Sequence, residues 1–215
     1  MDPAFAGTLP GPSQDQYARL ALLGAVPAET ASAVFRRALE ADPLRPIALA
    51  PVLPWWFARR DTVSLARFAE RVDSLAGHEP DRPLSNVVKH YAADAARAYV
   101  ALARRDTAVA LRAFAALPDS ACRLASVNCG LQKLTEARLL RAVGRHRQAL
   151  ELLDRWAGLE PLAVLERARL AERVGDRDKA AKAYHFVAAA WRHADPELRR
   201  YVLEGREGLQ RVAAE

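Results

Sequence analysis

Two cysteines lie seven residues apart and are the first candidates for chemistry in this chain. On one straight helix Cys122 and Cys129 would be about 10 Å apart, which is too far for a disulfide bond. Loop-forming residues such as Pro118 and Gly130 flank them, and in a loop the two thiols can approach closely enough to bond. The alternatives are a Cys122–Cys129 disulfide or two unbonded thiols. A metal site would need two more ligands, and no histidine or further cysteine lies nearby in the sequence.

Motifs for catalysis are absent from the sequence. The five histidines form no HExxH pair, the serines lie in no GxSxG elbow, and the ten glycines are scattered singly. No nucleophile stands beside a base in a recognisable arrangement. We therefore expect no enzyme activity, no cofactor and no metal.

Charge and hydropathy narrow the classes of partner. The 215 residues include 32 lysines and arginines against 26 acidic residues, a net charge of +6. Basic residues alternate with acidic ones along most of the expected helices, whereas nucleic-acid binding needs them on one face, so nucleic acid is an unfavoured partner. No apolar run is long enough to cross a membrane, and the start of the chain lacks the features of a signal peptide.

These features favour a cytoplasmic location. A disulfide between the cysteines would favour an oxidising compartment such as the periplasm instead, if the chain is a fragment of a larger protein. Residues 1–14 are interpreted as a disordered tail or a remnant of cloning.

Repeated turns between apolar helical runs set out the architecture. The pentapeptide ARRDT occurs at 58–62 and again at 103–107, each time between two such runs. Gly144 and Gly175 take the same place later in the chain, where glycine fits the left-handed residue that ends a helix. An aspartate in three of these turns is expected to cap the next helix by accepting its free N–H groups. These aspartates are Asp61, Asp106 and Asp176.

Four of the expected second helices share a spacing of small and large residues, and in two of them a proline follows. A small residue lets two helices approach closely, large residues four and seven positions later share its face, and proline stops the helix. Two segments have the full spacing: Ala31, Phe35, Ala38 and Pro43, and Ala149, Leu153, Trp156 and Pro161. This order resembles the tetratricopeptide repeat, whose period of about 34 residues is bracketed by the intervals between the turns.

The resemblance implies an all-α fold, a right-handed α-solenoid that forms a single domain over 15–215. The hairpins are expected at about 15–41, 47–76, 84–117, 131–157 and 162–193, followed by a capping helix at 196–213. Asp195 is the expected N-cap of that last helix, with Pro196 at its first position. Within the hairpins we expect helices at about 15–24, 28–41, 47–59, 62–76, 84–104, 107–117, 131–143, 146–157, 162–174 and 177–193.

The resemblance also implies a function. The run at 165–202 is similar to tetratricopeptide segments attached to bacterial serine/threonine kinases and related signalling proteins, although the chain has no kinase motif. A non-catalytic scaffold that binds a partner protein is therefore expected. The regulatory or sensory segment of a signalling kinase or transcription regulator is one alternative, and a nucleic-acid-binding helical repeat is another.

The first helix of each hairpin lines the concave surface in solenoids of this type, and its basic residues are candidates for binding. They would favour an acidic peptide, because the arginine fork matches a carboxylate. An ordinary charged helix surface is the alternative. Trp55 and Trp56 are either packing residues or an apolar anchor for the partner. The basic candidates are Lys89, Arg97, Lys133, Arg141, Arg169 and Arg173.

Overall fold

Helices form all the regular secondary structure that the computed structural model describes, at residues 14–41, 50–76, 83–119, 121, 129–156 and 161–214. The described residues contain no β-strand, which confirms the all-α prediction. The chain divides into two compact units, Met1–Asn128 and Cys129–Glu215, here called unit 1 and unit 2. The single solenoid domain expected over 15–215 stays a prediction.

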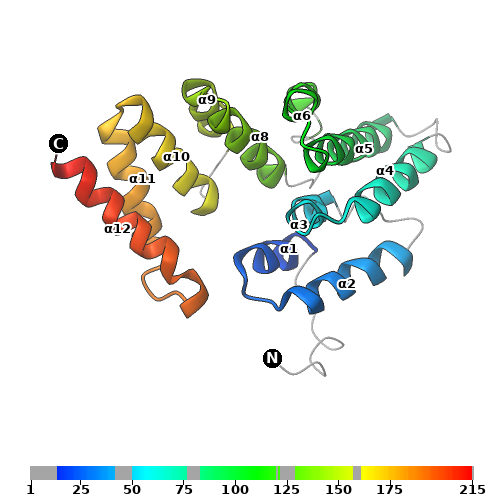
Figure 1. Cartoon of the computed structure of the whole chain (residues 1–215), viewed down its shortest axis with the longest axis horizontal. Coiled ribbons are helices and arrows are strands. Elements are labelled where there is room, and N and C mark those ends of the chain that lie inside the picture. Colours follow the sequence, from blue (N-terminus) through cyan, green and yellow to red (C-terminus); the bar gives the residue numbers. More distant parts are fainter. Residues whose placement is uncertain are drawn as a thin grey trace. The chain divides into compact units, whose positions relative to one another are not determined.

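Unit 1 builds its core around α3, α4 and α5, with α5 also packed on α6 (Figure 1). Its helices are α1 (Gln14–Leu23), α2 (Ala28–Ala41), α3 (Leu53–Ala58), α4 (Thr62–Ala76), α5 (Pro83–Ala103) and α6 (Thr107–Ala115). Buried aromatic rings join these helices, since Trp56 of α3 meets Phe68 of α4 at 5.8 Å between ring centres. Tyr99 of α5 meets Phe114 of α6 at 5.1 Å.

Unit 2 stacks its helices in chain order, and each helix packs on the next (Figure 1). It contains α8 (Gly130–Ala142), α9 (His146–Trp156), α10 (Pro161–Val174), α11 (Arg177–Ala190), a 3-10 turn (Pro196–Leu198) and α12 (Arg199–Ala214). The middle helix, α10, contacts both α8 and α12 as well as α9 and α11. Helix α10 is therefore a neighbour of both α8 and α12, so its side chains can reach those of either helix.

Aspartate caps hold the starts of the second helices, as the turn sequences predict. In each case a carboxylate oxygen accepts the backbone N–H three residues later, which satisfies one of the free donors at the helix start. The pairs are Asp61 and Ser64 at 2.9 Å, Asp106 and Val109 at 3.0 Å, and Asp176 and Lys179 at 3.1 Å.

The same turns contain a left-handed residue. Gly144 and Gly175 have φ of +79° and +82°, as expected for glycines that end a helix. In the two ARRDT turns the equivalent residues are arginines, and Arg60 and Arg105 adopt φ of +56° and +66°. These turns keep the same backbone path with an unfavourable residue, because left-handed φ costs an L-residue about 1–2 kcal/mol.

The observed helices depart from the predicted ranges in three places. The helix expected at 47–59 begins at Leu53 after a 3-10 turn at 50–52, and residues 47–49 lie outside the described ones. The helix expected at 177–193 ends at Ala190. Asp195 takes the predicted N-cap position before Pro196, but the element that it begins is a 3-10 turn before α12, and its side chain makes no capping hydrogen bond.

Two further predictions concern the chain ends and membranes. Residues 1–13 of the expected tail lie outside the described residues, and Gln14 already belongs to α1. None of the described helices combines the length and the apolar character needed to span a bilayer.

Candidate functional site

Three arginines converge on one buried carboxylate in unit 2. The side chain of Glu166 on α10 is fully buried, and its Oε1 accepts a hydrogen bond from Arg141 Nε of α8 at 2.5 Å. Its Oε2 accepts one from Arg169 Nη1 at 2.8 Å, and Arg138 Nε of α8 lies 3.8 Å away. Glu166 therefore holds guanidinium groups from two helices in one array.

Helix α12 closes the other side of this array through Glu204. Arg169 Nε and Nη2 donate to the two oxygens of Glu204 at 2.6 and 2.7 Å, the bidentate geometry typical of strong arginine–carboxylate pairs. The hydrogen bond to Glu204 is the main reason why the pKa of Arg169 is raised. The five residues that link α8, α10 and α12 are called the arginine face below: Arg138, Arg141, Glu166, Arg169 and Glu204.

Arg138 is the least compensated member of the arginine face. The face has three guanidiniums and two carboxylates, and Glu166 at 3.8 Å is the one described residue that Arg138 pairs with. Desolvation by neighbouring protein atoms lowers the pKa of Arg138, attraction to Glu166 opposes this, and repulsion from Arg169 adds to the lowering. Nevertheless 45% of its side-chain surface remains exposed. The face therefore combines an excess of positive charge with an arginine side chain that is partly exposed.

The structure brings together only part of the predicted basic set. Arg141 and Arg169 lie in the arginine face, whereas Arg173 is exposed elsewhere on α10. Lys133 is 5% exposed, pairs with Glu136 at 3.3 Å and lies over the ring of Trp156, so it is a packing residue of unit 2.

The other two basic candidates belong to unit 1. Lys89 is buried, and its ammonium group donates to the carbonyl oxygen of Leu75 at 3.2 Å. Arg97 is exposed and forms ion pairs with Asp73 and Asp94. Neither side chain resembles a free cation on an open surface.

The adjacent tryptophans are packing residues. Trp55 is 5% exposed and contacts the ring of Phe35, while Trp56 is 2% exposed and contacts Phe68. An anchor in a partner's groove needs an exposed ring, and neither indole offers one. The packing alternative accounts for both residues.

The cysteines are only partly described. Cys129 is buried and takes part in a disulfide bond. The other cysteine, Cys122, lies outside the described residues, so the Cys122–Cys129 pair stays a prediction.

Sequence reasoning missed the two glutamates that organise the arginine face. Glu166 looks like one more charged residue in a helix whose residues alternate in sign, and nothing in its neighbours marks it as buried. Its partner Arg141 is 25 residues away, and Glu204 is 35 residues from Arg169. An alignment of the repeats that placed α8, α10 and α12 side by side is the signal that could have indicated these contacts from the sequence.

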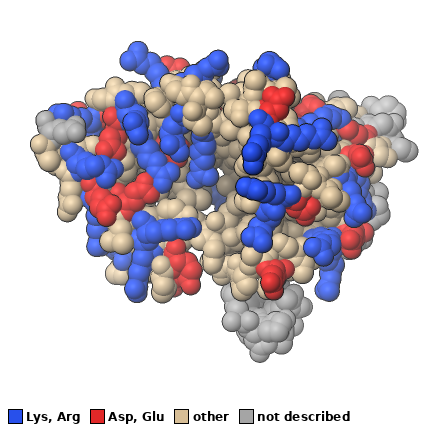
Figure 2. All heavy atoms as spheres, in the orientation of Figure 1, with Lys and Arg blue, Asp and Glu red and all other residues tan. Residues whose placement is uncertain are grey.

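The described part of the chain contains no group of three histidine, cysteine or acidic residues able to hold a metal ion. On the face drawn in Figure 2, lysine and arginine side chains are interspersed with aspartate and glutamate and form no single basic patch.

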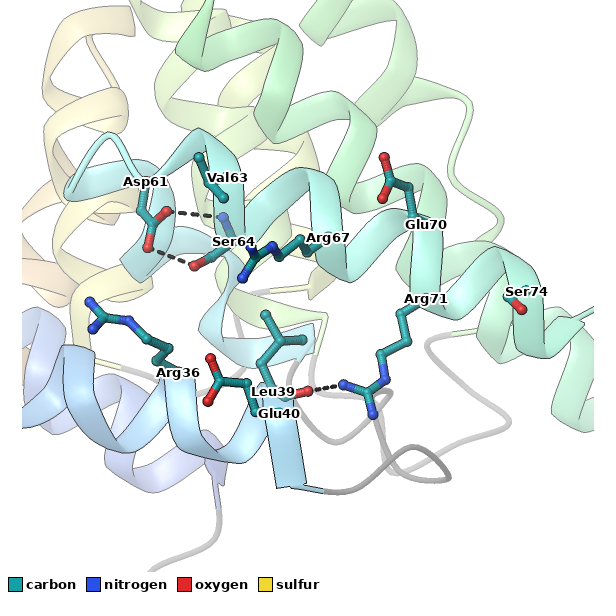
Figure 3. A pocket seen from close by; sticks show the side chains of 10 residues that line it. All are labelled: Arg36, Leu39, Glu40, Asp61, Val63, Ser64, Arg67, Glu70, Arg71 and Ser74. Carbon is teal, nitrogen blue, oxygen red and sulfur yellow. Dashed lines mark hydrogen bonds between the residues drawn. The ribbon is translucent and has the colours of Figure 1, made fainter.

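A groove of about 760 Å³ lies between α2 and α4 in unit 1 (Figure 3). Both helices contribute charged side chains to it, among them Arg36 from α2 and Arg67 from α4. Leu39 and Val63 supply apolar lining, and Val63 is 60% exposed.

Comparison with known proteins gives no match: no family model fits the chain, and no curated protein and no solved structure matches it.

Proposed function

We propose that this chain is a non-catalytic protein-interaction module, built from tetratricopeptide-like helical hairpins, whose arginine face binds an acidic segment of a partner protein. The repeated turns with their aspartate caps and left-handed residues support the hairpin register. The single observation that carries the binding site is the convergence of three arginines on the buried carboxylate of Glu166.

A buried ion pair is weak evidence for a stabilising role, because desolvation of the charges can exceed their attraction. A positioning role accounts for a fully buried glutamate that lies among three guanidiniums. Glu166 holds Arg138 and Arg141 in place on α8, and the incomplete neutralisation leaves room for one more carboxylate at Arg138. Each exposed arginine–carboxylate contact contributes about 0.2–1 kcal/mol, so the partner needs further contacts for useful affinity.

A peptide-binding assay tests this proposal. The probe is a fluorescein-labelled peptide of alternating glutamate and leucine, and binding is followed by fluorescence anisotropy at low and high salt. Arg138→Gln should weaken binding, whereas the control Arg147→Gln, an exposed arginine on α9, should not. Equal affinity for the two variants and the unchanged chain contradicts the proposal.

Nucleic acid is the competing class of partner, and a DNA probe in the same assay distinguishes it from an acidic peptide. A single- or double-stranded DNA probe that binds the unchanged chain more tightly than the acidic peptide, with a steep loss of affinity on adding salt, would favour that class. The interspersed charges in Figure 2 favour the peptide.

A further inference from the structure

Two arginines line the groove between α2 and α4. The guanidiniums of Arg36 and Arg67 make no hydrogen bond or ion pair with any described residue. Figure 3 draws both side chains at the end of the groove where Asp61 and Ser64 lie. Both arginines are exposed, and they reach the groove from different helices.

The groove also has acidic lining, from Glu40 on α2, Asp61 and Glu70. Glu40 is exposed one helical turn after Arg36, and no ion pair joins these two side chains. Asp61 caps α4 and accepts hydrogen bonds from the Ser64 backbone at 2.9 Å and from its hydroxyl at 2.7 Å. Arg71 donates to the carbonyl oxygen of Leu39, which ties α4 to the last turns of α2. Glu70 and Ser74 lie toward the opposite end of the groove in Figure 3.

A smaller groove in unit 2 lies at the equivalent place and offers a comparison. That groove, of about 460 Å³, also includes the capping aspartate of its second helix, so Asp176 corresponds to Asp61. From this alignment Lys179 corresponds to Ser64. In the small–large spacing of the preceding helices, Asp154 takes the place of Arg36.

Unit 2 spans its groove with an ion pair. Lys179 Nζ donates to Asp154 Oδ2 at 2.7 Å, and hydrogen bonding to this carboxylate raises the pKa of Lys179. In unit 1 the same two positions hold Ser64 and Arg36, which cannot form an ion pair with each other, so Arg36 has no carboxylate opposite it at this position.

We propose that the α2–α4 groove is a second binding site, which takes an acidic segment of a partner protein through Arg36 and Arg67. Two guanidinium forks suit carboxylate oxygens. The neighbouring carboxylate of Asp61 would repel the double charge of a phosphate more than the single charge of a carboxylate. The exposed side chain of Val63 offers apolar contact to a residue beside the acidic one. This proposal is independent of the arginine face, which belongs to unit 2.

The test uses the full chain carrying Arg138→Gln, so that the arginine face contributes little to the signal. The probe is the fluorescein-labelled peptide of alternating glutamate and leucine, and a peptide with glutamine in place of glutamate controls for the charge. The groove variant adds Arg36→Gln and Arg67→Gln. Its matched control adds Arg37→Gln and Arg104→Gln, two exposed arginines that do not line the groove.

The groove variant should raise the dissociation constant about tenfold, while the matched control should change it less than about twofold. All variants should keep the urea midpoint of the parent, because the substituted side chains are exposed. Equal weakening by the two double variants would mean attraction to net charge alone and overturn the proposal, as would equal binding of the glutamine peptide. Displacement of the peptide by an equimolar concentration of inorganic phosphate would overturn the carboxylate assignment.

Discussion

Gly208 on α12 faces the ring of Tyr184 on α11 so closely that a Cβ at position 208 would lie 2.6 Å from three of the ring carbons. The ring has no freedom to retreat, because Tyr184 is fully buried and its hydroxyl donates to Glu172 Oε2 at 2.5 Å. Arg211 of α12 also pairs with Glu172 at 2.8 Å. The close approach of α12 to α11 therefore depends on the absence of a side chain at residue 208.

Gly208→Ala should destabilise unit 2 by about 1–3 kcal/mol, because the added methyl group overpacks the contact with Tyr184. The sign distinguishes this cause from helix propensity, since alanine in a helix is ordinarily about 1 kcal/mol better than glycine. Urea unfolding followed by circular dichroism measures the change. The control Glu207→Ala, at an exposed neighbour, should stay within about 0.5 kcal/mol, and a more stable Gly208→Ala chain would contradict the packing described here.

In the left-handed turns, we expect replacement of arginine and replacement of glycine to change the stability of the chain in opposite directions. Arg105→Gly should stabilise the chain by up to about 1 kcal/mol, because glycine relieves the positive φ at this position at some cost in unfolded-state entropy. Gly175→Ala should destabilise it by about 1 kcal/mol, although the space around residue 175 is open. Thermal melts of the two variants check the pair. Shifts of the same sign would show that these two turns do not share a backbone path.

The carboxylate of Glu172 predicts a pH dependence of stability. Hydrogen bonding from Arg211 is the main reason why the pKa of Glu172 is lowered in the folded chain, and the hydroxyl of Tyr184 adds to it. A carboxyl group with a lowered folded pKa contributes stability above its unfolded pKa of about 4.3, and this contribution is lost as the pH falls further. The free energy of unfolding of Glu172→Gln should therefore fall less steeply than that of the unchanged chain as the pH decreases from about 6 to 3. Urea titrations across this range measure the two slopes, and parallel slopes would contradict the assignment.

Local signals in the sequence predicted the hairpin turns well. An aspartate cap such as Asp106 and a left-handed glycine such as Gly175 act on residues within one helical turn, so they are readable without knowledge of the packing. The starts and ends of most described helices follow from these signals. The exception at the start of α12 has a related reason, because Pro196 begins a 3-10 turn while Asp195 makes no capping bond.

The candidate sites could be predicted only in part, because they depend on contacts between helices far apart in the chain. The sequence pointed to Arg141 and Arg169, but their counter-ions come from α10 and α12 through tertiary packing. Lys133 was a misleading candidate for the same reason, since a lysine in a helix looks exposed until a ring such as that of Trp156 covers it.

Glu166 provides the sharpest test of the arginine face. Glu166→Gln removes a fully buried carboxylate and leaves three guanidiniums facing one another. Loss of one member of a buried ion pair costs about 3–5 kcal/mol, and a value near the lower end is expected because the arginines are partly exposed. Urea unfolding measures this loss, and Glu166→Asp is the control that keeps the charge.

Binding separates a positioning role from a purely structural one. If Glu166 positions the arginines for an acidic segment, Glu166→Gln releases them and should weaken binding of the glutamate–leucine peptide. Added positive charge without a positioning role would instead tighten binding, with a stronger dependence on salt. The affinity is measured well below the urea midpoint of the variant, so that the population is folded. A variant that is less stable but binds the peptide with unchanged affinity would show that the arginines around Glu166 serve the fold and that the acidic partner binds elsewhere.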